Sequence, residues 1–468
     1  MNLLGIDVGT TSIKAAVFDE SGKQLSQTTV DYTLKQEGNI VEFEADAYWQ
    51  LCRRAIAEVT EGITVEALSI DTQCETMIVA DEEGRPLRNA IVWLDNRAEE
   101  EAAAICAQFG EKTVYEVTGQ PEIAATWPAC KLLWLQRHEP ELWAKTKKIF
   151  LLEDYLLFKM TGQFVTEKTL QSSSLYFDIR TGTWWPEMLA FLGVTENMLP
   201  RLENSAVPVG SFDGMTVVTG AMDQCAGAIG AGVTRPGIMS EMTGTTMVLF
   251  VPGTDIPPYD PESKVPCHYN YDGDYARILW TTTAGMSLKW FKNNFCESFD
   301  FKELDELAES VPPGCDGLVM RPHLCGATMP RYNPNAKGAF YGVTLQHTRG
   351  HFVRSILEAV ACMLKSNLDY LKMPAEEIRL MGGGAKSPLW CQIKADMTGM
   401  RLVTLSHDET ACLGSAILAG VGAGVFENVQ SAAERIIDVK QAYTPQNVDY
   451  SRTYEAYTKL DDLLDTME

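Results

Sequence analysis

The sequence predicts an α/β protein built from two related halves. Apolar runs of strand length alternate along the chain with Glu- and Ala-rich segments of helix length, which is the pattern of the α/β class. The tripeptide Gly-Thr-Thr occurs twice between two apolar runs, at residues 9–11 and 244–246. A chain of 468 residues is too long for one compact core, so two domains are expected.

The first predicted element is a β-hairpin, in which the apolar runs Leu3–Ile6 and Ile13–Phe18 flank the small polar turn at residues 9–11. Segments 47–59 and 98–109 predict helices, whereas 65–73 and 75–95 predict strands separated by turns. This order gives the first half its alternation of strands and helices.

The second half repeats the hairpin at residues 238–253. The Pro- and Gly-containing segment 233–237 predicts the boundary, and hence domains at 1–236 and 237–468. Residues 378–390 read as a strand, three glycines and a helix, a turn that lets a flat ligand approach the backbone closely. The tail from about residue 448 is predicted to be helical.

Composition narrows the classes of partner. The net charge is −24, which repels nucleic acid and anionic lipid, so neither is an expected partner. No apolar run reaches the roughly 20 residues that span a bilayer, and the first residues lack the basic region of a signal peptide. The 12 cysteines form no CxxC pair and predict reduced thiols in the cytoplasm.

The two Gly-Thr-Thr turns predict phosphate binding in a cleft between the halves, because such turns present N–H groups and hydroxyls without bulky side chains. Asp7 lies beside the first turn and is placed to hold Mg²⁺, directly or through water. Lys14 would add a positive charge.

A lone carboxylate, Asp223, stands in the run GAMDQCAGAIGAG at residues 220–232. It precedes a predicted helix of small residues that allows close packing against the cleft wall. A helix N-terminus stabilises a carboxylate, so a structural and a catalytic role for Asp223 are compatible.

Several segments together resemble the FGGY carbohydrate kinases, which belong to the actin, hexokinase and heat-shock chaperone ATPase superfamily. They are DVGTTSIKAAVFD, GAMDQCAGAIGAG, MTGTT, GGGAKSPLW, WPACKLLWLQRHEPE with Lys131 and Trp134, and GAFYGVTLQHTRGHFVRSILEA. The resemblance covers nearly the whole chain in the family's order. It implies two ribonuclease-H-like domains flanking a deep cleft.

The resemblance also implies roles for individual residues. Asp223 would be the catalytic base. The phosphates of Mg-ATP would lie at Asp7, Gly9, Thr10, Thr11, Lys14, Gly244, Thr245 and Thr246. The rest of the nucleotide would be bordered by Gly285, Lys289, Gly383, Gly384 and Ala385.

The sugar pocket is expected to contain Gln73, Cys74, Glu75, Trp93, Asp95, Trp127, Asp223 and Gln224. The segment Gln73-Cys74-Glu75-Thr76 is nearer to glycerol kinases but lacks their arginine, and Gln224 also resembles glycerol kinases. The segment from residue 127 onward is more similar to xylulokinases. The best reading is a pentulose such as xylulose, with a glycerol-kinase-like polyol kinase as the alternative. Core packing is an equal alternative for Trp93 and Trp127.

The implied reaction moves the γ-phosphoryl group of ATP to a terminal hydroxyl of a small sugar, with Asp223 accepting the proton. Two other classes remain as alternatives: an actin- or chaperone-type ATPase without an acceptor, and a sugar-responsive DNA regulator. The acidic chain and the absence of a helix-turn-helix pattern disfavour the regulator. A homodimer is an assembly common in such families.

Overall fold

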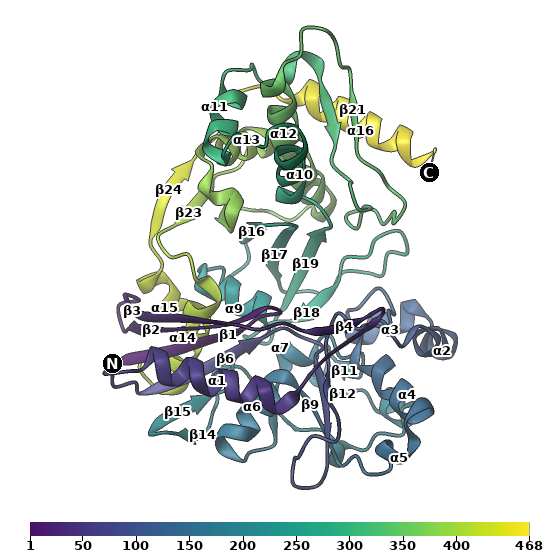
Figure 1. Ribbon diagram of the computed structural model, residues 1–468, viewed down its shortest axis with the longest axis vertical. Coiled ribbons are helices and arrows are strands. Elements are labelled where there is room, and N and C mark those ends of the chain that lie inside the picture. Colours follow the sequence, from purple (N-terminus) through teal and green to yellow (C-terminus); the bar gives the residue numbers. More distant parts are fainter. Residues whose placement is uncertain (468) are drawn as a thin grey trace.

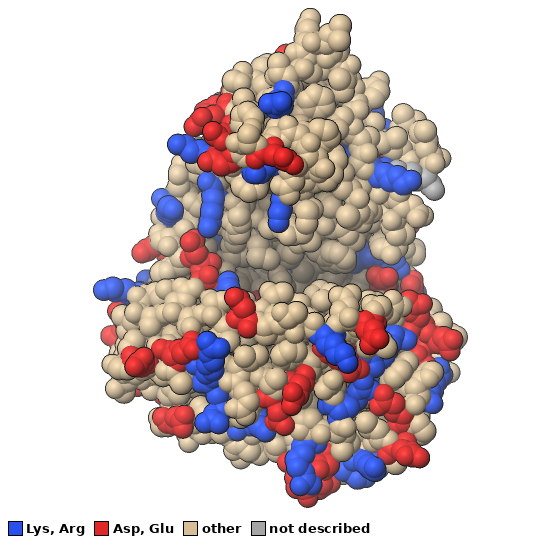
Figure 2. Space-filling view, in the orientation of Figure 1, with Lys and Arg blue, Asp and Glu red and all other residues tan. Residues whose placement is uncertain are grey.

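The computed structural model describes residues 1–467 and confirms the predicted α/β class. Two lobes, one above the other, each contain a mixed sheet with helices packed around it (Figure 1). The surface is hollowed at the waist between them (Figure 2). In the described part of the chain, no helix is both long and apolar enough to cross a bilayer.

The sheet of the first lobe begins with the predicted hairpin, in which β1 and β2 are antiparallel and Asp7 lies opposite Lys14. Strands β6 and β15 then add parallel to β1. In spatial order the strands are β14 (Pro208–Phe212), β15 (Met215–Val218), β6 (Ala67–Thr72), β1 (Asn2–Val8), β2 (Ser12–Asp19) and β3 (Gln24–Asp31).

The sheet of the second lobe repeats this plan, because a second hairpin, β16–β17, is followed by strands parallel to β16. In order the strands are β18 (Cys267–Tyr269), β19 (Tyr275–Thr281), β17 (Met247–Gly253), β16 (Ile238–Thr243), β22 (Glu377–Met381), β23 (Leu402–Leu405) and β24 (Val439–Tyr443). The two Gly-Thr-Thr turns therefore occupy equivalent places in two similar sheets.

A third, smaller sheet includes β7, the strand that directly follows the expected sugar segment at residues 73–76. Its strands in order are β4 (Lys35–Glu37), β5 (Ile40–Phe43), β8 (Ala90–Ile91), β7 (Met77–Ala80) and β9 (Lys148–Leu151). The helices of the first half are α1 (Ala45–Val59), α2 (Glu99–Phe109), α3 (Glu111–Thr118), α4 (Pro128–His138), α5 (Pro140–Trp143), α6 (Leu152–Thr161), α7 (Lys168–Gln171), α8 (Pro186–Phe191) and α9 (Asp223–Gly230). The helices predicted at 47–59 and 98–109 are thus confirmed as α1 and α2.

The helices of the second half are α10 (Gly285–Phe295), α11 (Phe301–Glu309), α12 (Arg349–Leu371), α13 (Pro388–Thr398), α14 (Thr410–Gly422), α15 (Val429–Ile436) and α16 (Ser451–Asp465). Two of them, α14 and α15, come late in the chain yet pack within the hydrophobic core of the first lobe. These two helices of the predicted second domain therefore contact the first one directly.

Close packing of α14 depends on glycines. A Cβ atom at Gly414 would lie 1.9 Å from the Ala226 carbonyl oxygen of α9, and one at Gly230 would lie 1.8 Å from the Thr410 carbonyl oxygen. A Cβ at Gly5 of β1 would lie 1.7 Å from the Cys412 carbonyl oxygen. No larger residue fits at these crossings without a backbone shift, so the small residues after Asp223 do allow the predicted close approach.

Candidate active site

Three of the predicted site residues meet at one edge of the first sheet. Strands β1, β6 and β15 are parallel, so their carboxyl ends lie at the same edge, where open α/β sheets bind ligands. Asp7 is near the end of β1, Gln73 follows β6, and a bridge between Thr72 and Met222 brings in the start of α9. Topology therefore brings Asp7, Gln73 and Asp223 together.

The first Gly-Thr-Thr turn is held from both sides. The Gly9 N–H donates to the Ser12 carbonyl at 3.0 Å, and the Tyr32 hydroxyl donates to the Gly9 carbonyl. The Trp93 indole N–H donates to the Thr10 hydroxyl at 3.0 Å, which connects an expected sugar residue to the turn. Thr11 is exposed.

Lys14, on the strand after this turn, is partly exposed and forms an ion pair of 2.8 Å with Glu409, the residue that precedes α14. Burial alone would lower the Lys14 pKa, but the pairing with Glu409 raises it above its ordinary value. Lys14 therefore stays cationic beside the turn.

Asp223 is the first residue of α9 and is half-buried. Its Oδ1 accepts the Gln224 N–H at 2.7 Å and lies 3.9 Å from the Cys74 sulfur. Burial, together with the negative charges of Asp7 and Glu75, raises its pKa to about 7. A carboxyl that titrates there can both accept and release a proton near neutral pH.

The segment leading to Asp223 is anchored by groups that the sequence patterns did not single out. The Gly220 N–H donates to Glu153 at 2.9 Å, and the Met222 N–H donates to the Thr169 hydroxyl at 2.8 Å. That hydroxyl in turn donates to Glu167 at 2.8 Å. The start of α9, which carries Asp223, is thus fixed by hydrogen bonds within its own lobe.

A second buried acid lies beside Asp7. Asp71 is its partner in the β1–β6 register, has no solvent exposure and accepts a 2.7 Å hydrogen bond from Ser415 of α14. Burial raises the Asp7 pKa to about 6, whereas Lys14 and a hydrogen bond with Asp71 oppose the rise. Sequence reasoning missed Asp71, although the Ile-Asp pair at residues 6–7, near the end of β1, recurs at residues 70–71 of β6.

The expected sugar segment is buried and strained. Gln73 is 3% exposed; its amide nitrogen donates to the Tyr48 hydroxyl at 3.1 Å, and its Oε1 has no partner in the described part of the protein. Glu75 has a φ of +44°, which is unusual for a residue other than glycine and is a form of strain found at functional sites. The backbone N–H of Trp93 donates to the Thr76 hydroxyl at 3.2 Å and so connects this segment to residues 92–95.

Two expected sugar residues, Asp95 and Trp127, have hydrogen-bond partners within the protein. Asp95 is fully buried, pairs with Arg97 at 2.7 Å and accepts the Val41 N–H at 2.6 Å. Trp127 packs on the hydrophobic core and donates its indole N–H to the Glu122 carbonyl at 2.9 Å. Gln224, in the first turn of α9, is half-buried beside Asp223.

In the second lobe a cavity of about 600 Å³ lies at the carboxyl ends of β16 and β22. Its volume suits a small-molecule ligand. It is lined by six of the predicted nucleotide residues, Gly244, Thr245, Gly285, Lys289, Gly383 and Gly384, but not by Thr246 or Ala385. Additional lining residues that sequence reasoning missed include Phe301, Lys302, Asp305, Lys386 and Trp390.

Glycines bring the backbone close together in this cavity. The Gly285 N–H donates to the Gly244 carbonyl at 3.0 Å, and a Cβ at Gly285 would lie 2.3 Å from that oxygen. Behind the turn, buried Lys394 contacts Glu241 at 2.9 Å and the Thr243 hydroxyl at 2.8 Å. The second turn is thus supported by a buried ion pair.

The donor set fits a magnesium ion carried by phosphates better than an all-protein metal centre. Across residues 1–467, no three His, Cys, Asp or Glu side chains are grouped to hold a metal ion. Mg²⁺ is commonly held by one or two carboxylates together with substrate phosphates and water. Asp7, half-buried beside the first turn, can supply such a carboxylate.

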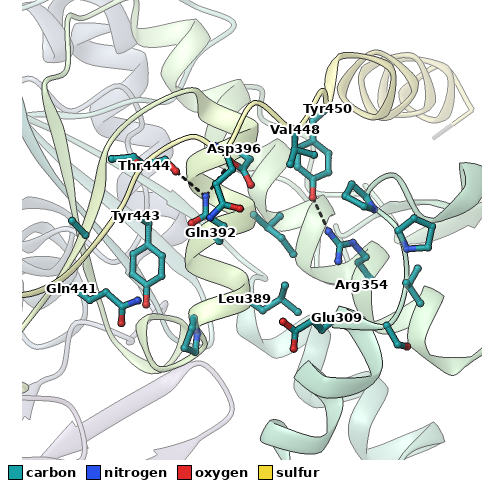
Figure 3. Close-up of a pocket in the computed structure, with 18 residues that line it drawn as sticks. Glu309, Arg354, Leu389, Gln392, Asp396, Gln441, Tyr443, Thr444, Val448 and Tyr450 are labelled. Atoms are coloured by element: carbon teal, nitrogen blue, oxygen red, sulfur yellow. Dashed lines mark hydrogen bonds between the residues drawn. The ribbon is translucent and has the colours of Figure 1, made fainter.

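A cavity of about 840 Å³ lies elsewhere in the second lobe, between α13, β24 and the segment before α16 (Figure 3). None of the predicted site residues lines it. Its one arginine, Arg354, pairs with Glu358 at 2.8 Å and donates to the Tyr450 hydroxyl at 3.0 Å, so its charge is already compensated.

Comparison with known proteins follows the same division of the chain. The N-terminal domain of the FGGY family of carbohydrate kinases matches residues 2–230, and its C-terminal domain matches residues 242–423. A xylulose kinase of Bacillus subtilis is 29% identical over 98% of this chain and 96% of its own length. A xylulose kinase of Staphylococcus epidermidis is 30% identical over 97% of this chain and 94% of its own length. A gluconokinase of Bacillus licheniformis is 27% identical over 93% of this chain and 90% of its own length.

Solved structures share the fold. A "xyloylose kinase" from Brucella ovis superposes with a TM-score of 0.92 at 23% identity, covering all of both chains. A glycerol kinase from Plasmodium falciparum with ADP gives 0.90 at 22% identity, covering 99% of this chain and 98% of that one. With family matches over most of its length, this chain belongs to the FGGY family of carbohydrate kinases.

Proposed function

We propose that the protein transfers the γ-phosphoryl group of ATP to a terminal hydroxyl of a pentulose such as xylulose. The observation that carries this proposal is the position of Asp223, whose carboxylate stands beside Cys74 of the expected sugar segment and at the same sheet edge as the first phosphate turn. Relatives named xylulose kinase, similar over nearly the whole chain, support the choice of sugar.

In the proposed reaction the sugar hydroxyl gives its proton to Asp223 as its oxygen forms the new bond to phosphorus. The pKa of about 7 keeps a large fraction of this carboxyl ionised at neutral pH. Lys14 and the N–H groups of both Gly-Thr-Thr turns would neutralise charge on the moving phosphoryl group. Mg²⁺, held by Asp7 and the phosphates, would supply further positive charge.

Because the two turns belong to different lobes, the site is complete only when both lobes contact one nucleotide. Gly244, Thr245 and Lys289 line the cavity of the second lobe, and the adenosine would occupy it. We expect sugar binding to favour closure, which limits wasteful transfer to water.

An uncharged acceptor is favoured over an acid. A gluconokinase is among the relatives, but gluconate would bring its own carboxylate next to Asp223, whose pKa burial and the charges of Asp7 and Glu75 already raise. Glycerol stays as the alternative acceptor, on the strength of Gln73, Glu75 and Gln224. The free thiols of all 12 cysteines are consistent with a cytoplasmic enzyme, and a homodimer stays a prediction.

ADP release with Mg-ATP and a panel of xylulose, other ketoses, gluconate and glycerol tests the proposal. We expect turnover to depend on the acceptor and kcat/KM to be highest for xylulose. A higher kcat/KM for glycerol would establish the alternative, whereas ADP release that ignores every acceptor would refute a sugar kinase.

A further inference from the structure

The pair Lys131 and Trp134 has no part in the proposed chemistry, yet both side chains support the expected sugar pocket. They are three residues apart on α4 and therefore share one face of that helix. This face is turned toward two segments, residues 73–76 and 92–95, which carry most of the expected sugar contacts.

Lys131 is fully buried, and its ammonium donates to the Val92 carbonyl at 2.9 Å and to the Glu75 carbonyl at 3.3 Å. Within residues 1–467 this ammonium forms no ion pair of 4.0 Å or less with a carboxylate. Burial lowers the Lys131 pKa to about 8, against the more distant charges of Glu75 and Asp95. Burying an ammonium without an ion pair is costly, and the hydrogen bonds to the two carbonyls offset part of that cost.

The two carbonyls belong to the two separate segments. Glu75 is the strained residue with φ of +44°, and Val92 opens a turn that the Asp95 N–H closes with a 3.0 Å hydrogen bond to the same carbonyl. Trp93, which follows Val92, donates its backbone N–H to the Thr76 hydroxyl and its indole N–H to the Thr10 hydroxyl of the first Gly-Thr-Thr turn. The lysine thus connects the sugar segments to each other and, through Trp93, to the phosphate turn.

Trp134 acts on the far end of the second segment. The guanidinium of Arg97 lies over its ring, 4.9 Å from the centroid, and pairs with Asp95 at 2.7 Å. A cation held by a ring face and a carboxylate has little freedom to move. The position of Asp95 is therefore fixed by Arg97 and, through it, by Trp134.

We propose that Lys131 is a positioning residue for the acceptor sugar, because it fixes the Glu75 and Val92 carbonyls and so sets the distance between the two sugar segments. Trp134 is its partner and holds the second segment through Arg97. The inference rests on the proposed function and extends it, since it assigns sugar recognition to a helix that need not touch the sugar.

The test is the KM of each substrate in Lys131→Met, a variant that keeps an unbranched side chain of similar length but removes the ammonium that donates the two hydrogen bonds. We expect the KM for the preferred sugar to rise about 10- to 100-fold, the scale of a misplaced contact, while the KM for ATP stays within about twofold. Lys145→Met, at an exposed lysine beyond the same helix, is the matched control and should change neither KM. A merely structural lysine would lower the Tm without separating the two KM values.

A second pair of variants decides the case in which Lys131→Met fails to fold. Trp134→Leu removes the ring face under Arg97 and should raise the sugar KM, whereas Trp134→Phe should restore most of the loss. Equal rises in both KM values, or an unchanged sugar KM in a folded variant, would overturn the inference while leaving the kinase intact. A wild-type protein that ignores every acceptor would overturn the proposed function and the inference with it.

Discussion

The Cys74 sulfur lies 3.9 Å from Oδ1 of Asp223, although 149 residues separate them in the chain. This contact joins the end of β6 to the start of α9 and sets the expected sugar segment directly against the proposed base. A hydroxyl bound by that segment therefore has a proton acceptor at hand.

Asp223→Asn removes the proton acceptor while keeping the shape of the side chain. We expect kcat to fall about 10²- to 10⁴-fold, the usual contribution of a general base. Because burial disfavours the ionised carboxylate, the variant should be at least as stable as wild type at pH 8. Kinetics with thermal unfolding measures both, and Asp213→Asn, at an exposed loop, is the control. Near-normal turnover in folded Asp223→Asn would remove the assignment.

The pH dependence of kcat/KM should show a limb near the Asp223 pKa of about 7, which burial and the charges of Asp7 and Glu75 raise. The base works only when ionised, so kcat/KM should fall about tenfold per pH unit below that limb and level off above it. Replacing Glu75 by Gln removes one repelling charge and should move the limb to lower pH. A limb that stays in place would show that Glu75 does not act on the base.

Lys14→Met removes the cation beside the first Gly-Thr-Thr turn. We expect kcat to fall about 10²- to 10³-fold, as for the loss of one group that stabilises the transition state. ADP affinity should change far less, because the charge matters most while the phosphoryl group moves. Calorimetric titration of ADP alongside steady-state rates separates the two effects. Equal losses in kcat and ADP affinity would assign Lys14 to ground-state binding.

Gly285→Ala places a Cβ 2.3 Å from the Gly244 carbonyl oxygen and should displace the second phosphate turn. The KM for ATP should rise by about tenfold or more, with the sugar KM nearly unchanged. Gly227→Ala is the matched control, because a Cβ there meets nothing within 4 Å and alanine favours a helix. A sugar KM that rises in parallel in Gly285→Ala would contradict the division of ligands between the lobes.

Gly414→Ala tests the crossing of α14 and α9. The added Cβ would lie 1.9 Å from the Ala226 carbonyl oxygen, so we expect a loss of about 1–3 kcal/mol in unfolding free energy, or more where the backbone cannot move. Chemical denaturation measures it. Wild-type stability would mean that the two helices lie farther apart than the structure has them.

Structural features that depend on residues close together in the sequence could be predicted. The hairpins, the glycine turn before α13 and the start of α9 at Asp223 each depend on neighbours in the chain, and the structure has all of them. Contacts between distant residues left no such signal. Ser415 reaches Asp71 across 344 positions, and Glu409 reaches Lys14 across 395. Only folding brings these pairs together.

Side-chain direction was also beyond the sequence. Asp95 was expected in the sugar pocket, and the structure shows that Arg97, two residues away, donates hydrogen bonds to both oxygens of its carboxylate. Likewise, the sequence showed Lys131 as part of a motif. Its partners, however, are the backbone carbonyls of Glu75 and Val92, and every residue has a carbonyl, so no residue type marks them as partners. Packing of α14 in the first lobe depends on glycine positions whose partners lie far along the chain.

The most direct test of the central claim is ³¹P NMR of the products formed from Mg-ATP and xylulose. A kinase with the proposed site yields a phosphate monoester of the sugar and ADP in equal amounts, and Asp223→Asn yields neither at a comparable rate. ADP accompanied only by inorganic phosphate, with the sugar unchanged, would contradict phosphoryl transfer to this acceptor.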